Sequence, residues 1–158
     1  MYKEKTNNIL MNIDKYDSIF NFDDKSIKIP VGYSLLEDKY LKNTPPTPSE
    51  IEYAINYTED EIEKLVPLLP KDFEISCKND FVVDIAVLSG KDKKSKIVLK
   101  TDELEYLFGQ YAEVSQGRVP SLSQKDISAK FYSKLLILRE FVHHLKVDNI
   151  NIIHKNAI

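Results

Sequence analysis

Hydrophobic positions in the first 47 residues follow a helical spacing and then an extended one. Four apolar side chains recur at steps of four, three and four: Ile9, Ile13, Tyr16 and Phe20. Such spacing predicts one face of an amphipathic helix over residues 7–20. Between residues 27 and 31 apolar residues alternate, which predicts a short strand, and Pro30 limits that strand to a sheet edge. We therefore expect residues 1–47 to form an N-terminal amphipathic helix and an extended arm.

Three later segments have the apolar periodicity of longer helices. They span about 48–66, 102–116 and 124–146. The first begins with Pro48 at the first helical position, between the two members of a capping box, Thr47 and Glu50. Ser123 and Asp126 form a second capping box, which predicts the start of the longest helix.

The chain between the first two helices is rich in strand-forming residues. Its three apolar runs, 72–77, 81–88 and 96–100, are separated by turn-like KND and SGKDKKS, which predicts an antiparallel meander over about 72–100. The middle run, FVVDIAVL, is apolar on both faces, as in a central strand. A buried helix over 80–89, closed by Gly90, is the alternative. A last run at 149–153 predicts another edge strand.

These elements predict an α+β fold in which a small antiparallel meander packs against three helices. With 158 residues the chain suits a single core. We expect residues 48–158 to form one globular domain after the 1–47 segment.

Composition and charge place the chain among folded globular proteins. It is 42% hydrophobic and 30% charged, and 22 basic against 25 acidic residues give a net charge of −3. This balance lacks the basic excess of a nucleic-acid binder, so sequence-specific nucleic-acid recognition is not expected. The lysine-rich segment 91–100 leaves purely electrostatic binding as a weaker alternative. There is no apolar run of about 20 residues and no signal-like N-terminus, which predicts a cytoplasmic protein without a membrane span.

Several catalytic and cofactor-binding motifs are absent. The sequence contains no phosphate-binding loop, dinucleotide fingerprint, nucleophile elbow, H-E-x-x-H helix or C-x-x-C pair. The single cysteine, Cys77, lies in a predicted strand, where a buried apolar role is favoured over that of a nucleophile. We therefore expect no cofactor.

One cluster of metal-binding residue types stands in LREFVHHL, at residues 138–145. Glu140 and His143 have the Glu-x-x-His spacing that places two metal ligands on one helix face, and His144 follows. No second such unit exists in the chain, so an intramolecular di-iron motif is incomplete. An exposed Glu–His ion pair explains the spacing; a metal site formed by these three residues, completed in a homodimer, is the alternative.

The segment QGRVPSLSQ offers a candidate anion site. It places Arg118, Ser121 and Ser123 ahead of the predicted helix terminus at residue 124, where backbone donors and the helix dipole favour anions. The alternative is that these side chains only cap the neighbouring helices.

The favoured interpretation of function is a small, non-catalytic interaction protein that binds a protein partner or a second copy of itself. Tyr53 and Tyr57 are the candidate partner-binding residues, because they lie one turn apart and off the apolar stripe of their helix. The alternative is a metal- or phosphate-dependent enzyme that uses the Glu140/His143/His144 helix or the Arg118 loop.

Overall fold

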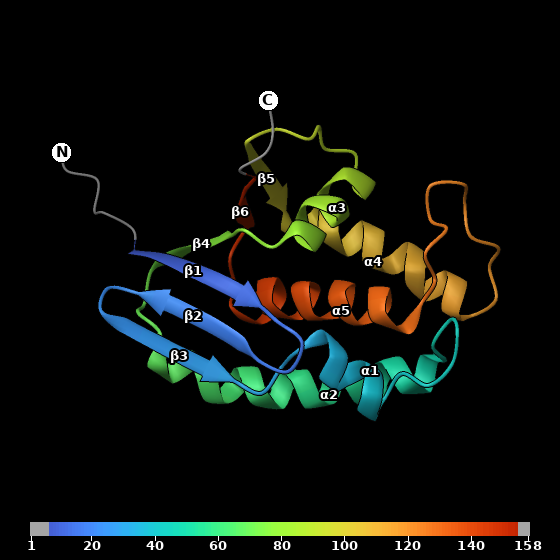
Figure 1. Ribbon diagram of the computed structural model, residues 1–158, viewed down its shortest axis with the longest axis horizontal. Coiled ribbons are helices and arrows are strands. Elements are labelled where there is room, and N and C mark those ends of the chain that lie inside the picture. Colours follow the sequence, from blue (N-terminus) through green and yellow to red (C-terminus); the bar gives the residue numbers. More distant parts are fainter. Residues whose placement is uncertain (1–6, 155–158) are drawn as a thin grey trace.

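A computed structural model describes residues 7–154 of the chain (Figure 1), and residues 1–6 and 155–158 lie outside that description. Its elements are, in chain order, β1 (Asn7–Ile13), β2 (Ser18–Phe22), β3 (Lys25–Ile29), α1 (Tyr33–Lys39), α2 (Pro48–Leu65), a 3₁₀ turn (Val66–Leu68), β4 (Phe73–Cys77), α3 (Asp80–Leu88), β5 (Lys96–Lys100), α4 (Thr101–Ser115), α5 (Ala129–His144) and β6 (Asn149–Ile153).

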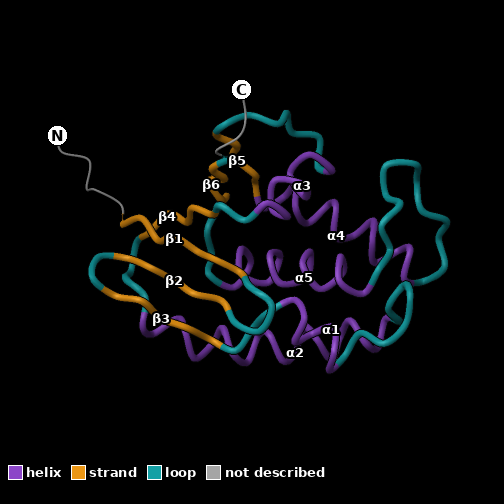
Figure 2. The backbone as a smooth tube through the Cα atoms, viewed as in Figure 1, coloured by secondary structure: helices purple, strands orange, loops and turns teal. Residues whose placement is uncertain are grey.

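The six strands form one mixed sheet in the order β3-β2-β1-β4-β6-β5 (Figure 2). β1, β4 and β6 are parallel, and the remaining neighbours pair antiparallel. One row of residues in register across five strands is fully or almost fully buried: Phe20, Met11, Cys77, Ile152 and Ile97. Because side chains alternate along each strand, one face of the sheet carries the core.

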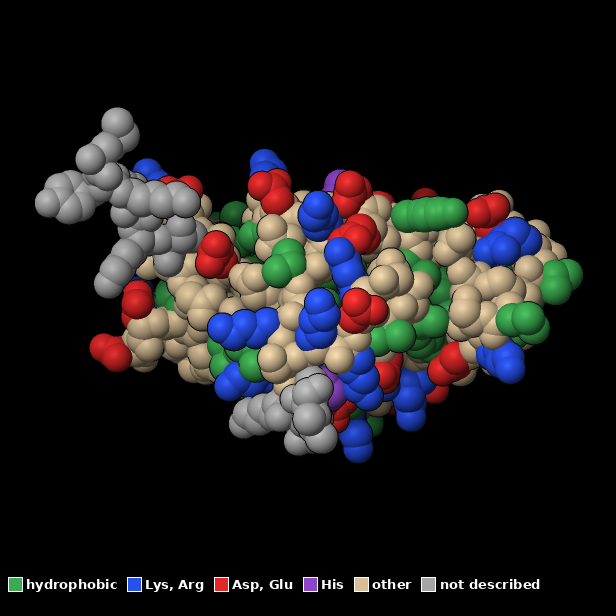
Figure 3. All heavy atoms as spheres, turned by 90° about the horizontal axis from the view of Figure 1, so that it is seen from above, with side chains coloured by type: hydrophobic (Ala, Val, Ile, Leu, Met, Phe, Trp, Pro, Cys, Tyr) green, Lys and Arg blue, Asp and Glu red, His purple; other side chains and the backbone are tan. Residues whose placement is uncertain are grey.

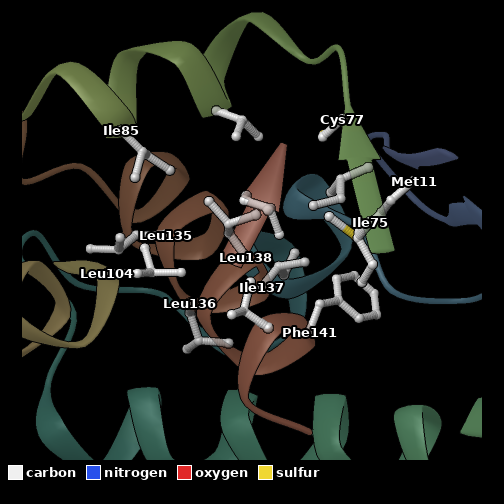
Figure 4. Packing of buried hydrophobic residues seen from close by; sticks show 14 of the residues in the cluster. Met11, Ile75, Cys77, Ile85, Leu104, Leu135, Leu136, Ile137, Leu138 and Phe141 are labelled. Carbon is white, nitrogen blue, oxygen red and sulfur yellow. The ribbon is translucent and has the colours of Figure 1, made fainter. Parts of the chain in front are cut away.

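Helix α5 lies at the centre of the core. Ten of its sixteen residues are buried, and it packs against α1, α2, α3 and α4. Figure 4 shows Phe141 on the side of Met11 and Ile75, while Leu135 lies toward Leu104 and Ile85. A helix that is enclosed in this way needs apolar residues around most of its circumference, as the sequence of α5 supplies.

The predicted N-terminal helix over residues 7–20 is wrong. These residues form β1 and β2, which pair with each other, and β1 also pairs with β4. The apolar residues of β1 fit a period of two as well as the helical spacing, since Ile9, Met11 and Ile13 are buried while Asn8 and Asn12 are exposed. The predicted strand near 27–31 is confirmed as the edge strand β3, which ends immediately before Pro30.

The α+β class is confirmed, whereas the antiparallel meander over 72–100 is only partly right. β4 and β5 form as expected, but the middle run is helix α3, which Gly90 closes with a φ of 95°. The strand at 149–153 is confirmed as β6, although it is interior rather than an edge. It inserts between β4 and β5, so these two strands never pair.

The long helices agree with the prediction except at one terminus. Thr47 and Glu50 form the expected capping box of α2. α5, however, begins at Ala129 instead of residue 124, because Ser128 supplies its cap by accepting a hydrogen bond from the N–H of Phe131. None of the helices in residues 7–154 is long and apolar enough to cross a membrane.

Candidate functional site

The parallel strands β1, β4 and β6 end at the same edge of the sheet. In open α/β sheets ligands bind beyond the carboxyl ends of parallel strands, because the turns and helix termini meet there. Here β1 leads into the turn 14–17, and β4 leads through Lys78 and Asn79 into α3. This strand-end site, residues 14–17 and 78–81, is therefore the place where the fold favours a ligand.

Asn79 joins the two turns of the strand-end site. Its side-chain oxygen accepts a hydrogen bond from the N–H of Ile13 at 3.0 Å, and its side-chain nitrogen donates to the carbonyl oxygen of Ile13 at 2.9 Å. The pair of bonds extends the β1–β4 pairing by one step beyond the strands. Asp14 and Asp80 directly follow the two residues of this bonded pair.

The turn after β1 is also held by hydrogen bonds from the start of α1. The N–H groups of Tyr33 and Ser34 donate to the carbonyl oxygens of Asp14 and Lys15. The backbone approach is so close that a Cβ atom at Gly32 would lie 2.4 Å from the carbonyl oxygen of Lys15. Only glycine fits at this position, and the turn is thereby rigidly seated.

The strand-end site combines backbone N–H donors at the start of α3 with exposed, flexible charged side chains. The first N–H groups of α3 have no side-chain cap, because the Asn79 side chain is engaged with Ile13 instead. Such a helix terminus favours an anion. Lys15 and Lys78 are exposed beside it, and the exposed carboxylates of Asp14 and Asp80 are ligands of the type that Mg²⁺ prefers. Neither turn contains glycine, so recognition of an anion falls to side chains and the helix terminus.

Cys77 lies next to this site in surroundings that do not favour a nucleophile. Its side chain is fully buried, and burial raises the pKa of the thiol to about 11, against the lowering effect of hydrogen bonds from the Asn79 and Lys78 backbone. The sulfur instead contacts the side-chain oxygen of Asn79 at 3.2 Å. This environment agrees with the buried apolar role expected from the sequence.

Native protein is therefore expected to resist alkylation at Cys77. With iodoacetamide at pH 8 the folded chain should remain unmodified, since the thiolate is scarce and the sulfur is inaccessible, whereas the chain in urea should react fully. Intact-mass spectrometry measures both states. Rapid modification of the folded chain would show that Cys77 is reactive and that its burial is incorrectly assigned.

The predicted anion-binding residues Arg118, Ser121 and Ser123 lie in the connection between α4 and α5. The guanidinium of Arg118 donates to the carbonyl oxygen of Gln110 at 2.9 Å and to the side chain of Gln124 at 3.2 Å. It therefore ties the connection to α4. The helix terminus on which the anion prediction rested is not there, because α5 begins only at residue 129.

The two histidines of the LREFVHHL segment have different carboxylate partners. His144 Nε2 lies 3.2 Å from Glu140 Oε1 and 3.0 Å from Glu59 Oε2 on α2. His143 Nδ1 lies 3.6 Å from Glu105 Oε1, and its ring packs edge-on against that of His144, with 5.0 Å between ring centroids. The expected exposed pair is wrong for Glu140, which is completely buried against α2. Burial raises the pKa of Glu140, and the nearby charges of Arg139 and His144 act in the opposite direction.

The two candidate tyrosines of α2 have different surroundings. The hydroxyl of Tyr57 donates to the carbonyl oxygen of Pro30 at 2.6 Å, and its ring packs on that of Tyr40. Tyr53 is 65% exposed. Only Tyr53 thus presents most of its ring to solvent, while Tyr57 fastens α2 to the end of β3.

Comparison with known proteins gives structural relatives but no sequence family. No family model and no curated protein matches the sequence. The chain is similar to a Ppx/GppA phosphatase of Aquifex aeolicus, with a TM-score of 0.75 and 16% identity over 96% of this chain and 54% of that one. An exopolyphosphatase from Cytophaga hutchinsonii gives a TM-score of 0.74 and 12% identity, with the same two coverages. This chain therefore has the fold found in about half the length of these proteins.

The likeness corrects the favoured interpretation of function. A non-catalytic interaction protein is contradicted, because the structural relatives include phosphatases and an exopolyphosphatase. The surface over α3 and α4 shows Lys, Arg, Asp and Glu side chains interspersed, with no single extended charge patch on that face (Figure 3).

Proposed function

We propose that this chain is a phosphatase-type domain that binds a phosphoanhydride substrate, such as polyphosphate, at the strand-end site. The observation that carries this proposal is the likeness to phosphatases over almost the whole chain. Because the chain spans about half of those proteins, we propose that it supplies one side of the reaction site.

The geometry of the strand-end site supports this proposal. Asn79 holds the turn after β1 beside the start of α3, so that the uncapped helix terminus faces the same region as the exposed Lys15 and Lys78. The helix terminus and the two lysines would bind a phosphate group, and Mg²⁺ would offset the carboxylates of Asp14, Asp17 and Asp80 in the same turns. This arrangement replaces the glycine-rich backbone cradle that the sequence lacks.

The corresponding reaction is hydrolysis of a terminal phosphoanhydride bond. Water attacks the terminal phosphorus in line with the bridging oxygen, the P–O bond breaks and its electrons leave with the shortened chain. One proton of the water stays on the inorganic phosphate that forms, and the other passes to the leaving oxygen. Catalysis of this kind depends on positioning and on neutralising charge. Lys15, Lys78 and the start of α3 would supply that charge, and Asp14 and Asp80 would hold Mg²⁺ at the substrate oxygens.

Polyphosphate is expected to bind the purified chain and to raise its melting temperature. A double variant, Lys15→Gln with Lys78→Gln, should lose this stabilisation, because both flexible cations are removed. The matched control, Lys93→Gln with Lys94→Gln, changes two exposed lysines between α3 and β5 and should keep it. Phosphate release with Mg²⁺, measured colorimetrically, tests whether this half alone turns over substrate.

Two outcomes would count against the proposal. Equal loss of stabilisation in both double variants would show only general attraction to lysines, which high salt should then abolish. Absence of any thermal shift with polyphosphate, pyrophosphate or phosphate would show that the fold is present without phosphate binding.

We also propose that the protein is located in the cytoplasm, because its single cysteine, Cys77, is buried and reduced and has no partner in the sequence for a disulfide within the chain.

A further inference from the structure

A second cluster of polar side chains lies between α2 and α5, outside the strand-end site. Glu140 and His144 are one turn apart on α5, and Glu59 meets them from α2. One ligand atom from each of the three residues lies within 4.8 Å of the others. The cluster therefore joins two helices through side chains of metal-binding types.

Two of the three ligand–ligand distances in the cluster match the edges of a metal coordination shell. Two ligands about 2.0–2.1 Å from a tetrahedral ion lie roughly 3.3 Å from each other. His144 Nε2 lies 3.0 Å from Glu59 Oε2 and 3.2 Å from Glu140 Oε1. Small movements of two partly exposed side chains, Glu59 and His144, would place all three atoms around one ion.

Glu140 is the member of the cluster that most needs a partner. Its side chain is 0% exposed, and Oε1 accepts no hydrogen bond even though the ring nitrogen of His144 is close. The other oxygen, Oε2, is held by Arg139. A buried carboxylate oxygen without a donor is costly, and a cation at Oε1 would satisfy it.

The charged side chains around the cluster have a net negative charge that a divalent cation would neutralise. Arg139 contributes one positive charge and bonds to both Glu105 and Glu140. Together with Glu59 there are three carboxylates, so with His144 neutral the group has a net charge of −2. Arg139 also orients Glu140, as hydrogen-bond partners of metal ligands commonly do.

We propose that Glu59, Glu140 and His144 bind one divalent transition-metal ion, such as Zn²⁺, and that this ion crosslinks α2 to α5. The imidazole favours such an ion over Mg²⁺ or Ca²⁺, which prefer oxygen ligands. His144 lies five residues before β6 begins, so the cluster is near the amino ends of the parallel strands. The strand-end site is at their carboxyl ends. The metal therefore stabilises the helix pair, and this inference does not depend on the proposed function.

The test uses the full chain after treatment with EDTA and removal of the chelator. Zn²⁺ should bind at one ion per chain in a calorimetric titration and should raise the melting temperature, whereas Mg²⁺ should do neither. Glu59→Gln and His144→Ala should each weaken Zn²⁺ binding by more than about tenfold. Losing a residue that only hydrogen-bonds to a metal ligand already weakens binding by about 10–100-fold, so losing a ligand itself should cost at least as much. The matched control is His143→Ala: this neighbouring histidine packs on the His144 ring but pairs with Glu105, so its removal should weaken Zn²⁺ binding much less than loss of His144.

Three results would overturn the proposal. They are no saturable Zn²⁺ binding by the wild-type chain, equal weakening in His143→Ala, and binding that persists in both Glu59→Gln and His144→Ala. Glu59 and His144 are 34% and 30% exposed, so their variants remain informative if a change at the buried Glu140 prevents folding. Substitution with Co²⁺ adds an independent readout, because its visible absorption reports the ligand geometry directly.

Discussion

Replacing Phe141 with alanine is expected to lower the free energy of unfolding by about 3–5 kcal/mol. Phe141 is fully buried on α5, and its ring packs edge-on against that of Phe20 on β2, with 5.1 Å between ring centroids. The change removes this contact between the central helix and the sheet and leaves a cavity that close-packed neighbours fill only in part. Urea denaturation followed by circular dichroism measures the loss.

Tyr53→Ala is the matched control for the loss of an aromatic ring. Tyr53 is on α2 and 65% exposed, so its removal should change the free energy of unfolding by no more than about 0.5 kcal/mol. A loss of less than about 1 kcal/mol for Phe141→Ala would show that α5 does not form the centre of the core. Since the total stability of a domain is about 5–15 kcal/mol, the expected difference is easily resolved.

Features that depend on neighbouring residues could be predicted from the sequence. The capping box of Thr47 and Glu50 identifies the start of α2, because both hydrogen bonds lie within one turn. The end of β3 likewise fits Pro30, which has no N–H donor to continue the strand and follows its last residue, Ile29. In both cases the determining contacts span only a few residues.

Features that depend on distant residues were mispredicted. Ile9 and Ile13 suit a helix face as well as a strand face, and the choice is made by pairing with β4, more than sixty residues away. The run 81–88 is apolar on every side, so its pattern does not distinguish a strand from a helix. β6 takes the position beside β4 that the middle strand of a meander would occupy. No local pattern encodes that competition.

The two candidate sites were missed in part for the same reason. Glu140 and His144 could be identified from spacing along one helix, but Glu59 enters only through the packing of α2 on α5. Glu140 also departs from the expectation that a helix position off the apolar stripe is exposed, because α5 is enclosed on several sides. Asn79, within the turn-like KND, makes its hydrogen bonds with Ile13, 66 positions earlier, which no local pattern indicates.

Asn79→Ala is expected to lower the free energy of unfolding by about 2–4 kcal/mol, because each of two groups left unsatisfied costs about 1–3 kcal/mol when buried and both hydrogen bonds are only partly buried. The substitution deprives both the N–H and the carbonyl oxygen of Ile13 of their partner, and Ile13 is only 1% exposed. The turns of the strand-end site should then separate. We therefore expect a lower urea midpoint and, in the same variant, a loss of stabilisation by polyphosphate.

Asn12→Ala provides the control, since Asn12 adjoins Ile13 but is exposed on the other face of β1. It should change stability by no more than about 0.5 kcal/mol. Asn79→Asp should be intermediate: its carboxylate still accepts from the N–H of Ile13, yet it repels the carbonyl oxygen to which the amide donated. If Asn79→Ala instead unfolds like the wild-type chain, the two turns are held by α1 and Gly32 alone. Loss of polyphosphate stabilisation without loss of stability would mean that Asn79 acts on the ligand itself.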